Sequence, residues 1–344
     1  MKALQLTAWQ QGPELVDVPE PEPGPGEVVI KVGGAGACHS DLHVMEWPPG
    51  LLDWKLPFTL GHETAGWVHA IGSGVDGLRE GDAVLVYGPW GDGRCRTCRL
   101  GSENYCEHAS ELGAAGGGLG RDGGMAEYML VPRARWLVPI GDLDPVEAAP
   151  LADAGLTPYH AIKRSLHLLG PGSTVVVIGV GGLGHAAIQL VKALSPARVV
   201  AVDLAEAKLD LARRLGADLA LPSDDEAVGT IRGYTGGRGA EVVLDLVGSD
   251  PTLALGAKVA SVNGHLTVVG LGGGRLEFSF FALPYECSVA TTYWGSVTEL
   301  MEVVELARLG KLVIQTHRFP LSEATAAYQR MREGSLEGRA VIVP

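Results

Sequence analysis

The sequence predicts an α/β protein with two domains, one mostly β and the other built on a doubly wound parallel sheet. Its 344 residues exceed the usual size of a single domain. The first 150 residues contain short β-prone runs separated by glycine and proline. From about Gly172 onward, apolar runs alternate with helix-period segments, which is the pattern of a parallel sheet covered by helices.

In the first part of the chain we predict a barrel-like lobe of short strands, over residues 28–32, 65–68, 83–87 and 125–128. The proline- and glutamate-rich segment from Pro19 to Pro25 predicts a turn or an extended connector. Residues 113–124 include seven glycines in twelve positions. That density predicts a mobile loop without regular structure, and we expect it to border the active site.

In the second part we predict apolar strands over residues 175–178, 199–202, 242–245 and 266–269, with helices over 182–193 and 205–215 between them. After about Tyr293, a helix over 297–309 and a last segment ending at Val343 are expected to rejoin the first lobe. We therefore predict one domain from residues 1–153 and 293–344, and a second from residues 154–292.

The composition excludes some classes of partner. A formal net charge of -13 argues against nucleic acid and anionic membranes, which require a basic face. The chain does not start with a basic segment followed by an apolar one, and no apolar stretch reaches the ~18 residues of a membrane span, so we expect a cytoplasmic protein. Five cysteines, three of them closely spaced, indicate metal binding before disulfides in such a reducing compartment.

A glycine-rich turn, Gly179-Val180-Gly181-Gly182-Leu183-Gly184, lies between a predicted strand and a predicted helix. Its glycines permit a tight turn, the close approach of a pyrophosphate and close packing of the helix. Asp203 ends the next strand, 19 residues after Gly184, where its carboxylate can accept hydrogen bonds from the adenosine ribose. The carboxylate, followed by Leu204 instead of an arginine, favours NAD over NADP. The alternative is that Asp203 only caps the next helix.

Candidate metal ligands occur at three separate places. Cys38-His39-Ser40-Asp41-Leu42-His43 contains a thiol, a hydroxyl and two imidazoles, and Gly61-His62-Glu63 places an imidazole beside a carboxylate. Together with Asp153, these segments could supply three ligands and leave one position open, as a catalytic zinc requires. One thiolate and one carboxylate would balance the charge of Zn²⁺, so that the site can accept an alkoxide.

A second cluster has the spacing D-x2-C-x2-C-x7-C and consists of Asp92, Cys95, Cys98 and Cys106. This spacing suits a closed tetrahedral zinc that holds a loop. The alternatives are free thiols in a surface lobe, or a site in which His108 or Glu103 replaces Asp92.

Several of these motifs occur in the same order in one family. The chain resembles, over essentially its whole length, the zinc-containing alcohol dehydrogenases of the medium-chain dehydrogenase/reductase superfamily. The motifs that carry the resemblance are Cys38-His39-Ser40-Asp41, Gly61-His62-Glu63 with Gly66, Gly81-Asp82-Ala83-Val84, the cysteine cluster, the glycine-rich turn and Gly338-Arg339. A narrower similarity, to actinobacterial NAD-dependent secondary-alcohol dehydrogenases, lies in residues 87–91, 152–160 and 293–295. The resemblance implies a GroES-like catalytic domain and a Rossmann NAD-binding domain.

The resemblance also implies roles for individual residues. Cys38, His62 and Asp153 would bind catalytic zinc, with Glu63 behind them or as a transient ligand. Ser40 would contact the substrate oxygen, and His43 would end a proton relay that passes through the nicotinamide ribose. Further contacts with the cofactor are implied for His39, Thr157, Lys208, Leu271 and, at the pyrophosphate, Arg339. The alternative for Lys208 and Arg339 is that both are surface cations.

One departure from the family concerns Asp92, because many members have a cysteine there. A hard oxygen ligand is expected to hold zinc less tightly than a thiolate, which leaves the metal content of the second site open. Trp54, Leu119 and Trp294 are predicted to line the substrate pocket and to favour a bulky apolar substrate, such as a medium-chain or aryl secondary alcohol or its ketone. Ordinary core positions are the alternative for the two tryptophans.

The predicted function is reversible hydride transfer between a small alcohol and NAD, by a homodimer or homotetramer as in relatives. A polyol, threonine or primary aromatic alcohol dehydrogenase is the alternative within the class. A zinc-free quinone or enoyl reductase would not need Cys38, His62 and Asp153. A noncatalytic cofactor-binding protein would need neither Ser40 nor His43.

Overall fold

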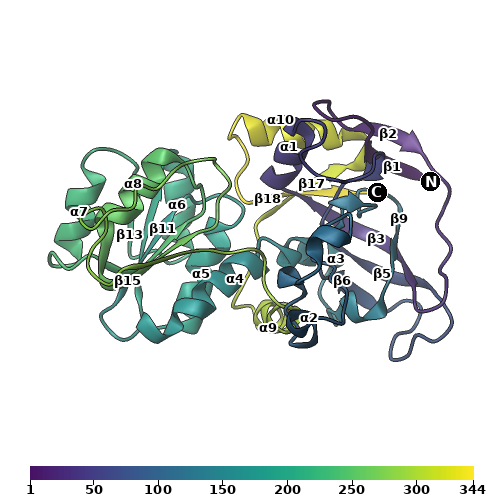
Figure 1. The fold of residues 1–344 in the computed structure, drawn as a ribbon, viewed down its shortest axis with the longest axis horizontal. Coiled ribbons are helices and arrows are strands. Elements are labelled where there is room, and N and C mark those ends of the chain that lie inside the picture. The colour runs from purple at the N-terminus through teal and green to yellow at the C-terminus, as the bar shows by residue number, and fades with distance from the viewer. The chain divides into compact units, whose positions relative to one another are not determined.

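The structure is a computed structural model that describes residues 1–344, and the chain divides into two compact units (Figure 1). Unit 1 comprises Met1–Leu156, Gly295–Leu309 and Ile314–Pro344, whereas unit 2 comprises Thr157–Trp294 and Gly310–Val313. Both ends of the chain, marked N and C in Figure 1, therefore belong to unit 1.

Unit 1 is built on mostly antiparallel sheets. A seven-stranded sheet has the order β10-β6-β5-β3-β18-β17, with β9 paired to β3. A three-stranded sheet has the order β2-β1-β4, and β7 pairs with β8. The strands are β1 (Lys2–Leu6), β2 (Glu14–Asp17), β3 (Val28–Ala37), β4 (Phe58–Thr59), β5 (Glu63–Ile71), β6 (Ala83–Val86), β7 (Gly116–Gly117), β8 (Gly120–Arg121), β9 (Tyr128–Val131), β10 (Leu137–Pro139), β17 (Thr316–Pro320) and β18 (Arg339–Val343).

The last segment of the chain completes the seven-stranded sheet. β18 pairs antiparallel with β3, and β17 pairs parallel with β18. The predicted return of this segment to the first lobe is confirmed. Ala340 of β18 lies opposite Ala37 of β3, so the register brings Arg339 close to the end of β3, where Cys38 follows.

The glycine-rich segment at residues 113–124 forms the two short strands β7 and β8, so the prediction that it has no regular structure is wrong. Its glycines lie against other backbone. A Cβ on Gly118, which has a φ of +79°, would lie 2.5 Å from the carbonyl carbon of Gly61 and 2.7 Å from the amide nitrogen of His62. These glycines permit two backbones to approach closely, which a count of glycines cannot distinguish from mobility.

The strand predicted over residues 125–128 begins at Tyr128 instead. Met125 bonds to other neighbours: its amide donates to the Leu60 carbonyl at 2.8 Å, and its carbonyl accepts from the Leu4 amide at 2.8 Å. Residue 125 therefore ties β1 to the segment before His62.

Unit 2 contains a six-stranded parallel sheet with the order β13-β12-β11-β14-β15-β16. All five residues of its central strand β11 are buried, as the apolar run predicts. The chain moves outward from β11 in one direction and then returns to start β14 on the other side. Ligands of such sheets bind beyond the carboxyl ends of the strands where the direction reverses. The strands are β11 (Thr174–Ile178), β12 (Arg198–Asp203), β13 (Leu219–Pro222), β14 (Ala240–Asp245), β15 (Ala260–Val268) and β16 (Ser288–Thr291).

The helices of the chain are short. Helix α9 begins after Ser296, whose hydroxyl accepts a hydrogen bond from the Glu299 amide at 3.2 Å. The helices are α1 (His39–Glu46), α2 (Arg96–Arg99), α3 (Pro145–Ala148), α4 (Leu156–Ser165), α5 (Gly184–Leu194), α6 (Glu206–Arg214), α7 (Ala227–Tyr234), α8 (Asp250–Val259), α9 (Val297–Arg308) and α10 (Ala324–Arg332). The 3₁₀ turns are η1 (Glu103–Tyr105), η2 (Ala109–Glu111), η3 (Ala134–Trp136), η4 (Ala149–Ala152), η5 (Leu166–Leu168) and η6 (Leu321–Glu323). None of the helices has the length and apolar character to cross a membrane.

Candidate metal centres and dinucleotide site

Cys38, His62 and Asp153 meet in unit 1 from three separate segments. Cys38 lies between β3 and α1, His62 precedes β5, and Asp153 follows η4. Cys38 Sγ lies 3.5 Å from Asp153 Oδ2, and His62 Nε2 lies 3.7 Å from the same oxygen. One ligand atom from each of the three buried residues lies within 4.8 Å of the others. The fold therefore brings the three predicted catalytic ligands together.

Asp41, in the first turn of α1, contacts two of these residues and is fully buried. Its Oδ1 lies 3.0 Å from His62 Nδ1, and its Oδ2 accepts hydrogen bonds from the Cys38 amide at 2.9 Å and the Tyr328 hydroxyl at 3.0 Å. A carboxylate on Nδ1 fixes the orientation of the imidazole, so that Nε2 faces the other ligands.

Sequence reasoning quoted Asp41 only as part of a motif and missed Tyr328 altogether. A local signal for Asp41 existed, because a carboxylate at the third position of a helix reaches back to the amide at its start. Tyr328 lies on α10, 287 residues from Asp41, and no local pattern links the two.

Behind these ligands, Glu63 and Arg339 form a buried ion pair. Arg339 Nη2 donates to Glu63 Oε1 at 2.6 Å and to Asp153 Oδ2 at 3.2 Å, and its Nε donates to Glu63 Oε2 at 2.8 Å. The Ala154 amide also donates to Glu63 Oε1, at 2.9 Å. Burial raises the pKa of Glu63, an effect that the Arg339 guanidinium opposes. Arg339 is 4% exposed, so the alternative of a surface cation is wrong for it. Its contact with a pyrophosphate stays a prediction.

The donor set fits a zinc ion. A thiolate sulfur, an imidazole nitrogen and a carboxylate oxygen are the atoms that catalytic zinc sites use, and three of them leave one position open. Burial lowers the pKa of His62, but the Asp41 and Asp153 carboxylates outweigh burial and raise it well above its usual value. A site that draws a proton onto its imidazole is electrostatically suited to a metal cation, which would replace that proton.

Ser40 and His43 lie on α1 next to this group. Ser40 Oγ is 3.5 Å from Cys38 Sγ, so its hydroxyl lies beside a candidate ligand. His43 follows three residues later and is partly buried; this spacing places both side chains on one side of the helix. His39, the first residue of α1, is exposed. The proton relay stays a prediction.

Two of the predicted pocket residues lie in unit 1 near the glycine-rich segment. Leu119 is buried within that segment, and a Cβ on Gly120 would lie 2.9 Å from the Trp54 ring. The Trp54 ring makes an edge contact with Phe58, with 6.1 Å between the ring centroids. Trp294 belongs to unit 2 and is buried. Their contact with a substrate stays a prediction.

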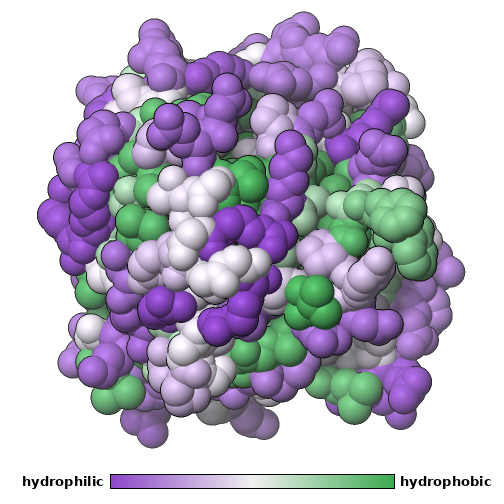
Figure 2. Space-filling model, turned by 90° about the vertical axis from the view of Figure 1, so that its left-hand side faces the viewer, coloured by the Kyte–Doolittle hydropathy of each residue, from purple (hydrophilic) through white to green (hydrophobic).

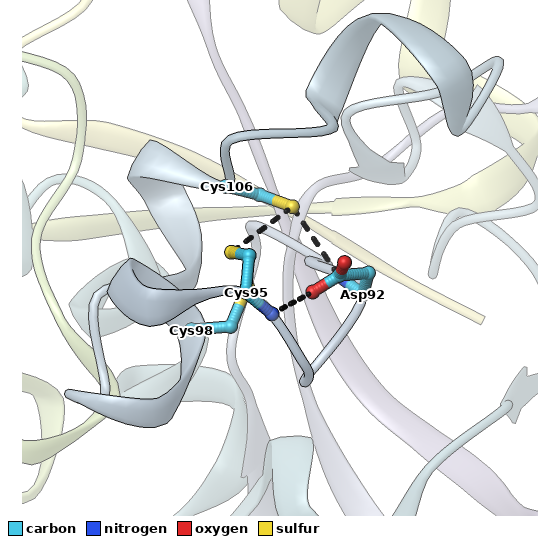
Figure 3. Close-up of side chains that lie close together, drawn as sticks. All are labelled: Asp92, Cys95, Cys98 and Cys106. Carbon is cyan, nitrogen blue, oxygen red and sulfur yellow. Dashed lines mark hydrogen bonds between the residues drawn. The ribbon is translucent and has the colours of Figure 1, made fainter.

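The second cluster also assembles in unit 1. Asp92, Cys95, Cys98 and Cys106 each offer a ligand atom within 4.8 Å of the others, and their side chains point toward one another (Figure 3). Cys95 Sγ lies 3.9 Å from Cys106 Sγ, and the Cys95 amide donates to Asp92 Oδ1 at 3.0 Å. The four residues come from one segment around α2 and η1, so a metal here would tie this loop to itself.

The geometry of this loop favours Asp92 as the fourth donor over the two alternatives. Glu103 accepts hydrogen bonds from Arg135 Nε at 2.8 Å and from the Trp136 indole at 2.9 Å, so its oxygens are engaged elsewhere. His108 Nδ1 lies 2.6 Å from Asp92 Oδ2, where it can orient the carboxylate. Hydrogen bonds from the amides of Cys95 and Arg94, with a further one from His108, hold the pKa of Asp92 well below its usual range.

The thiols of this loop differ in acidity. Burial raises the pKa of Cys95, but hydrogen bonds, that of Thr97 first among them, outweigh burial and lower it to about 7. Burial raises the pKa of Cys98. A bound cation would favour the thiolate form of both, because metal ligands must be deprotonated.

In unit 2, the glycine-rich turn connects β11 to α5 at the carboxyl end of the sheet. Gly179 has a φ of +89°, which only glycine adopts readily, and a Cβ on Gly184 would lie 1.9 Å from the Gly179 carbonyl oxygen. A Cβ on Gly181 would meet nothing within 4 Å, so this residue faces open space. The φ of Gly179 and the close packing of Gly184 fit the tight turn and the helix packing expected from the motif, while the approach of a pyrophosphate to Gly181 stays a prediction.

Asp203 lies at the end of β12, next to this turn. Its Oδ2 accepts a hydrogen bond from the Val180 amide at 2.7 Å, and its Oδ1 accepts one from the Ala205 amide at 3.1 Å. Ala205, and not Asp203, directly precedes α6, so Asp203 is not the cap of that helix. The other predicted cofactor residues of unit 2 differ in exposure: Leu271 is 63% exposed, Lys208 is partly buried and Thr157 is buried. Their contacts with NAD stay predictions.

Comparison with known families identifies the family of the chain. Residues 24–142 match the family described as "Alcohol dehydrogenase GroES-like domain", and residues 182–308 match "Zinc-binding dehydrogenase". The chain belongs to the zinc-containing alcohol dehydrogenases of the medium-chain dehydrogenase/reductase superfamily, with a GroES-like domain and a Rossmann domain.

Similar proteins cover the whole chain. An NAD-dependent alcohol dehydrogenase of Sulfurisphaera tokodaii is 38% identical over 355 residues, which span 100% of both chains. A D-arabinose 1-dehydrogenase (NADP(+)) of Saccharolobus solfataricus is 37% identical, over 100% of this chain and 97% of the relative. The crystal structure of an alcohol dehydrogenase from Aeropyrum pernix superimposes with a TM-score of 0.92 at 38% identity, over 100% of both chains.

Proposed function

We propose that this protein is an NAD-dependent zinc alcohol dehydrogenase, which transfers a hydride reversibly between an alcohol and NAD and yields a ketone or an aldehyde. The observation that carries the proposal is the convergence of Cys38, His62 and Asp153. In unit 2, the neighbouring strands β11 and β12 end at the glycine-rich turn and at Asp203, respectively. The Sulfurisphaera relative carries the same activity in its name. A zinc-free reductase would not need this ligand set.

Cys38, His62 and Asp153 would hold the zinc, which when bound acts as a Lewis acid and lowers the pKa of an alcohol. The Ser40 hydroxyl lies 3.5 Å from the sulfur of the ligand Cys38 and would take up the substrate proton, which His43 would release to solvent. Asp41 on Nδ1 orients the His62 ring so that Nε2 faces the ligand Asp153.

Arg339 has a separate task in this mechanism. It binds both oxygens of Glu63 and one oxygen of Asp153, and so it offsets two buried carboxylates at once. This pairing lets Glu63 stay buried next to the metal ligands, because an ionised carboxylate without a partner is costly to bury.

We propose NAD as the cofactor in preference to NADP. Asp203 presents a carboxylate at the end of β12, and the next residue, Leu204, is exposed and carries no positive charge. A 2′-phosphate at this place would meet a negative charge with no neighbouring arginine to offset it. The NADP(+)-dependent Saccharolobus relative shows that the family includes both preferences.

For the substrate, we propose a secondary alcohol with a medium-length or aryl apolar group, or the matching ketone. The Trp54 ring packs against Gly120, the neighbour of Leu119, and Gly118 of the same glycine-rich segment lies against the backbone of His62. An apolar wall beside a zinc site favours an apolar substituent over a second hydroxyl. A polyol or sugar substrate is the competing hypothesis, because one relative is named for D-arabinose.

The test is to measure NADH formation on a panel of secondary aliphatic, secondary aryl, primary aromatic and polyol substrates. The highest kcat/KM is expected for secondary apolar alcohols with NAD⁺. A preference for polyols would overturn the proposed substrate but would leave the assignment as a zinc-dependent alcohol dehydrogenase unchanged. Cys38→Ser is expected to abolish turnover while NAD⁺ binding survives, and an active Cys38→Ser enzyme would contradict the zinc mechanism.

We also propose that a second zinc is bound by Asp92, Cys95, Cys98 and Cys106. Metal analysis of the purified protein is expected to return two zincs per chain and one zinc for Asp92→Ala. A ratio of one for both proteins would show that the carboxylate does not stand in for a cysteine.

We propose a homodimer or homotetramer as the functional state. β16 is the last strand of its sheet and pairs only with β15, so it leaves backbone groups for another strand. Phe278, Phe280 and Phe281 are each more than 70% exposed in the segment before it. Figure 2 shows apolar areas between the hydrophilic side chains on one face of the molecule. Light scattering should give a mass of two or four chains of 35.9 kDa.

The compartment we propose is the cytoplasm. All five cysteines are free, and the three thiols of the second cluster lie close enough to oxidise if they were not reduced or bound to metal. Fractionation of the native host should place the activity in the cytoplasmic fraction.

A further inference from the structure

His185 is a buried titratable residue that has no part in the mechanism described above. It is the second residue of α5, directly after the glycine-rich turn, and it is fully buried. An imidazole is costly to bury without hydrogen bonds. Its Nδ1 lies 2.9 Å from the carbonyl oxygen of Gly181, four residues earlier. Because a carbonyl oxygen can only accept, Nδ1 must carry a proton and donate it to this oxygen.

The carbonyl of Gly181 therefore accepts two hydrogen bonds from His185. The backbone amide donates at 3.2 Å, which is at the long end of the range for such bonds, whereas the imidazole donates at the usual length of 2.9 Å. A Cβ on Gly181 would meet nothing within 4 Å, so packing does not hold the residue on that side. The side chain of His185 thus makes the shorter of the two contacts that fix this carbonyl.

The direction of the Gly181 carbonyl determines the direction of the next amide. A trans peptide is planar, with its C=O and N–H groups on opposite sides, so a Gly181 oxygen held toward His185 turns the Gly182 N–H away from α5. That is the side on which the free amides of a helix N-terminus bind phosphate groups. Glycine allows the backbone many other conformations, and the hydrogen bond from the imidazole disfavours them before a ligand binds.

The start of the turn is held from the other side. The Val180 amide donates to Asp203 Oδ2 at 2.7 Å. The Gly179 amide donates to the Val202 carbonyl at 2.8 Å. Strand β12 therefore fixes the first two residues of the turn, and α5 fixes the third through its buried imidazole.

We propose that His185 is a positioning residue for the dinucleotide. It does not touch the cofactor, but it holds the peptide between Gly181 and Gly182 so that the Gly182 N–H can donate to the pyrophosphate. The proposal rests on the binding of NAD at this turn, and it adds a residue that the glycine motif does not contain. Affinity for a ligand with a pyrophosphate should then depend on the imidazole, whereas affinity for adenosine alone should not.

Two substitutions of His185 separate this role from packing in the core. His185→Leu keeps a buried side chain but removes the donor. His185→Gln keeps a donor, and Gln189 shows that a glutamine on this helix can reach the carbonyl four residues earlier, because its Nε2 donates to the His185 carbonyl at 3.1 Å. Gln189→Leu is the matched control: it removes the same kind of bond one turn further along α5, together with the bonds to Val313.

The test compares the binding of ADP-ribose, which contains the pyrophosphate, with that of adenosine, which does not. Both are titrated into the zinc-loaded, full-length protein. His185→Leu is expected to bind ADP-ribose about tenfold more weakly, the effect of losing one hydrogen bond, and to bind adenosine like the wild type. His185→Gln and Gln189→Leu should bind both ligands like the wild type. For His185→Leu, the KM for NAD⁺ should rise while kcat changes little, because the imidazole does not touch the reacting atoms.

Equal losses for ADP-ribose and adenosine, or the same loss in His185→Gln as in His185→Leu, would overturn the proposal and show that His185 only packs in the core. A wild type that does not bind ADP-ribose would contradict the cofactor site itself. A further measurement needs no variant: nitrogen NMR of the wild type should find a proton on Nδ1 of His185. An unprotonated Nδ1 would overturn the proposal even if the variants failed to fold.

Discussion

The substitution Asp41→Asn tests how the catalytic metal site is held. Asp41 Oδ2 accepts hydrogen bonds from the Cys38 amide and the Tyr328 hydroxyl, while Oδ1 faces His62 Nδ1 at 3.0 Å. An asparagine can satisfy the two donors only by placing its carbonyl at the Oδ2 position. Its NH₂ group then faces Nδ1 of His62, which must become the acceptor. The ring proton moves to Nε2, and Nε2 loses the lone pair that a metal needs.

The expected loss is about 10–100-fold in zinc affinity at this site, or roughly 1.4–2.8 kcal/mol, as for other carboxylates that orient a metal-bound histidine. The assay is competition with a chromophoric chelator, in which the zinc of the second cluster acts as an internal reference because Asp41 does not contact it. Tyr328→Phe removes one hydrogen bond but keeps the carboxylate on Nδ1, so its loss should stay below about tenfold. Wild-type zinc affinity in Asp41→Asn would refute the reasoning.

Three further substitutions test other parts of the structure. Asp203→Ala should lower the preference for NAD⁺ over NADP⁺ at least tenfold in kcat/KM, because the charge that repels a 2′-phosphate is lost. Gly118→Ala should lower the melting temperature and the zinc content together, since its Cβ would lie 2.7 Å from the amide nitrogen of His62 and overpacking costs about 1–3 kcal/mol. Arg339→Met should lower the free energy of unfolding by about 3–5 kcal/mol in denaturant titrations, because it leaves Glu63 buried without its partner.

Each of these predictions has a matched control. Asp225→Ala removes an exposed carboxylate from unit 2 and should leave the cofactor ratio unchanged. Gly113→Ala also replaces a glycine of positive φ, but its Cβ would meet nothing closer than 3.9 Å. Arg318→Met breaks exposed ion pairs with Asp144 and Glu147, which contribute at most about 1 kcal/mol. An effect of equal size in variant and control would contradict the corresponding argument.

Local patterns in the sequence predicted much of the fold. The strand β11 is buried on both faces, and such strands leave a run of apolar residues that is visible without a structure. The ligands Cys38 and His62 and the glycine-rich turn were recognisable because their chemistry needs particular residue types at short spacing. The prediction of NAD and zinc therefore needed no knowledge of tertiary contacts.

Contacts between residues that are distant in the sequence could not be predicted. Tyr328 and Asp41 are 287 residues apart, and Arg339 and Glu63 are 276 residues apart, yet each pair is in direct contact. No periodicity or spacing encodes such pairs, so Arg339 was open to interpretation as a surface cation. The prediction for the glycine-rich segment was wrong for another reason. Glycine permits both mobility and close backbone packing, and only the neighbours of Gly118 in the structure show which of the two applies.

The measurement that tests the central claim most directly follows zinc content and alcohol oxidation on the same samples while zinc is removed by chelation and then restored. Turnover should disappear as the zinc held by Cys38, His62 and Asp153 is lost, NAD⁺ binding should persist, and turnover should return when zinc is added back. Near-normal turnover by protein that contains no zinc would contradict the account.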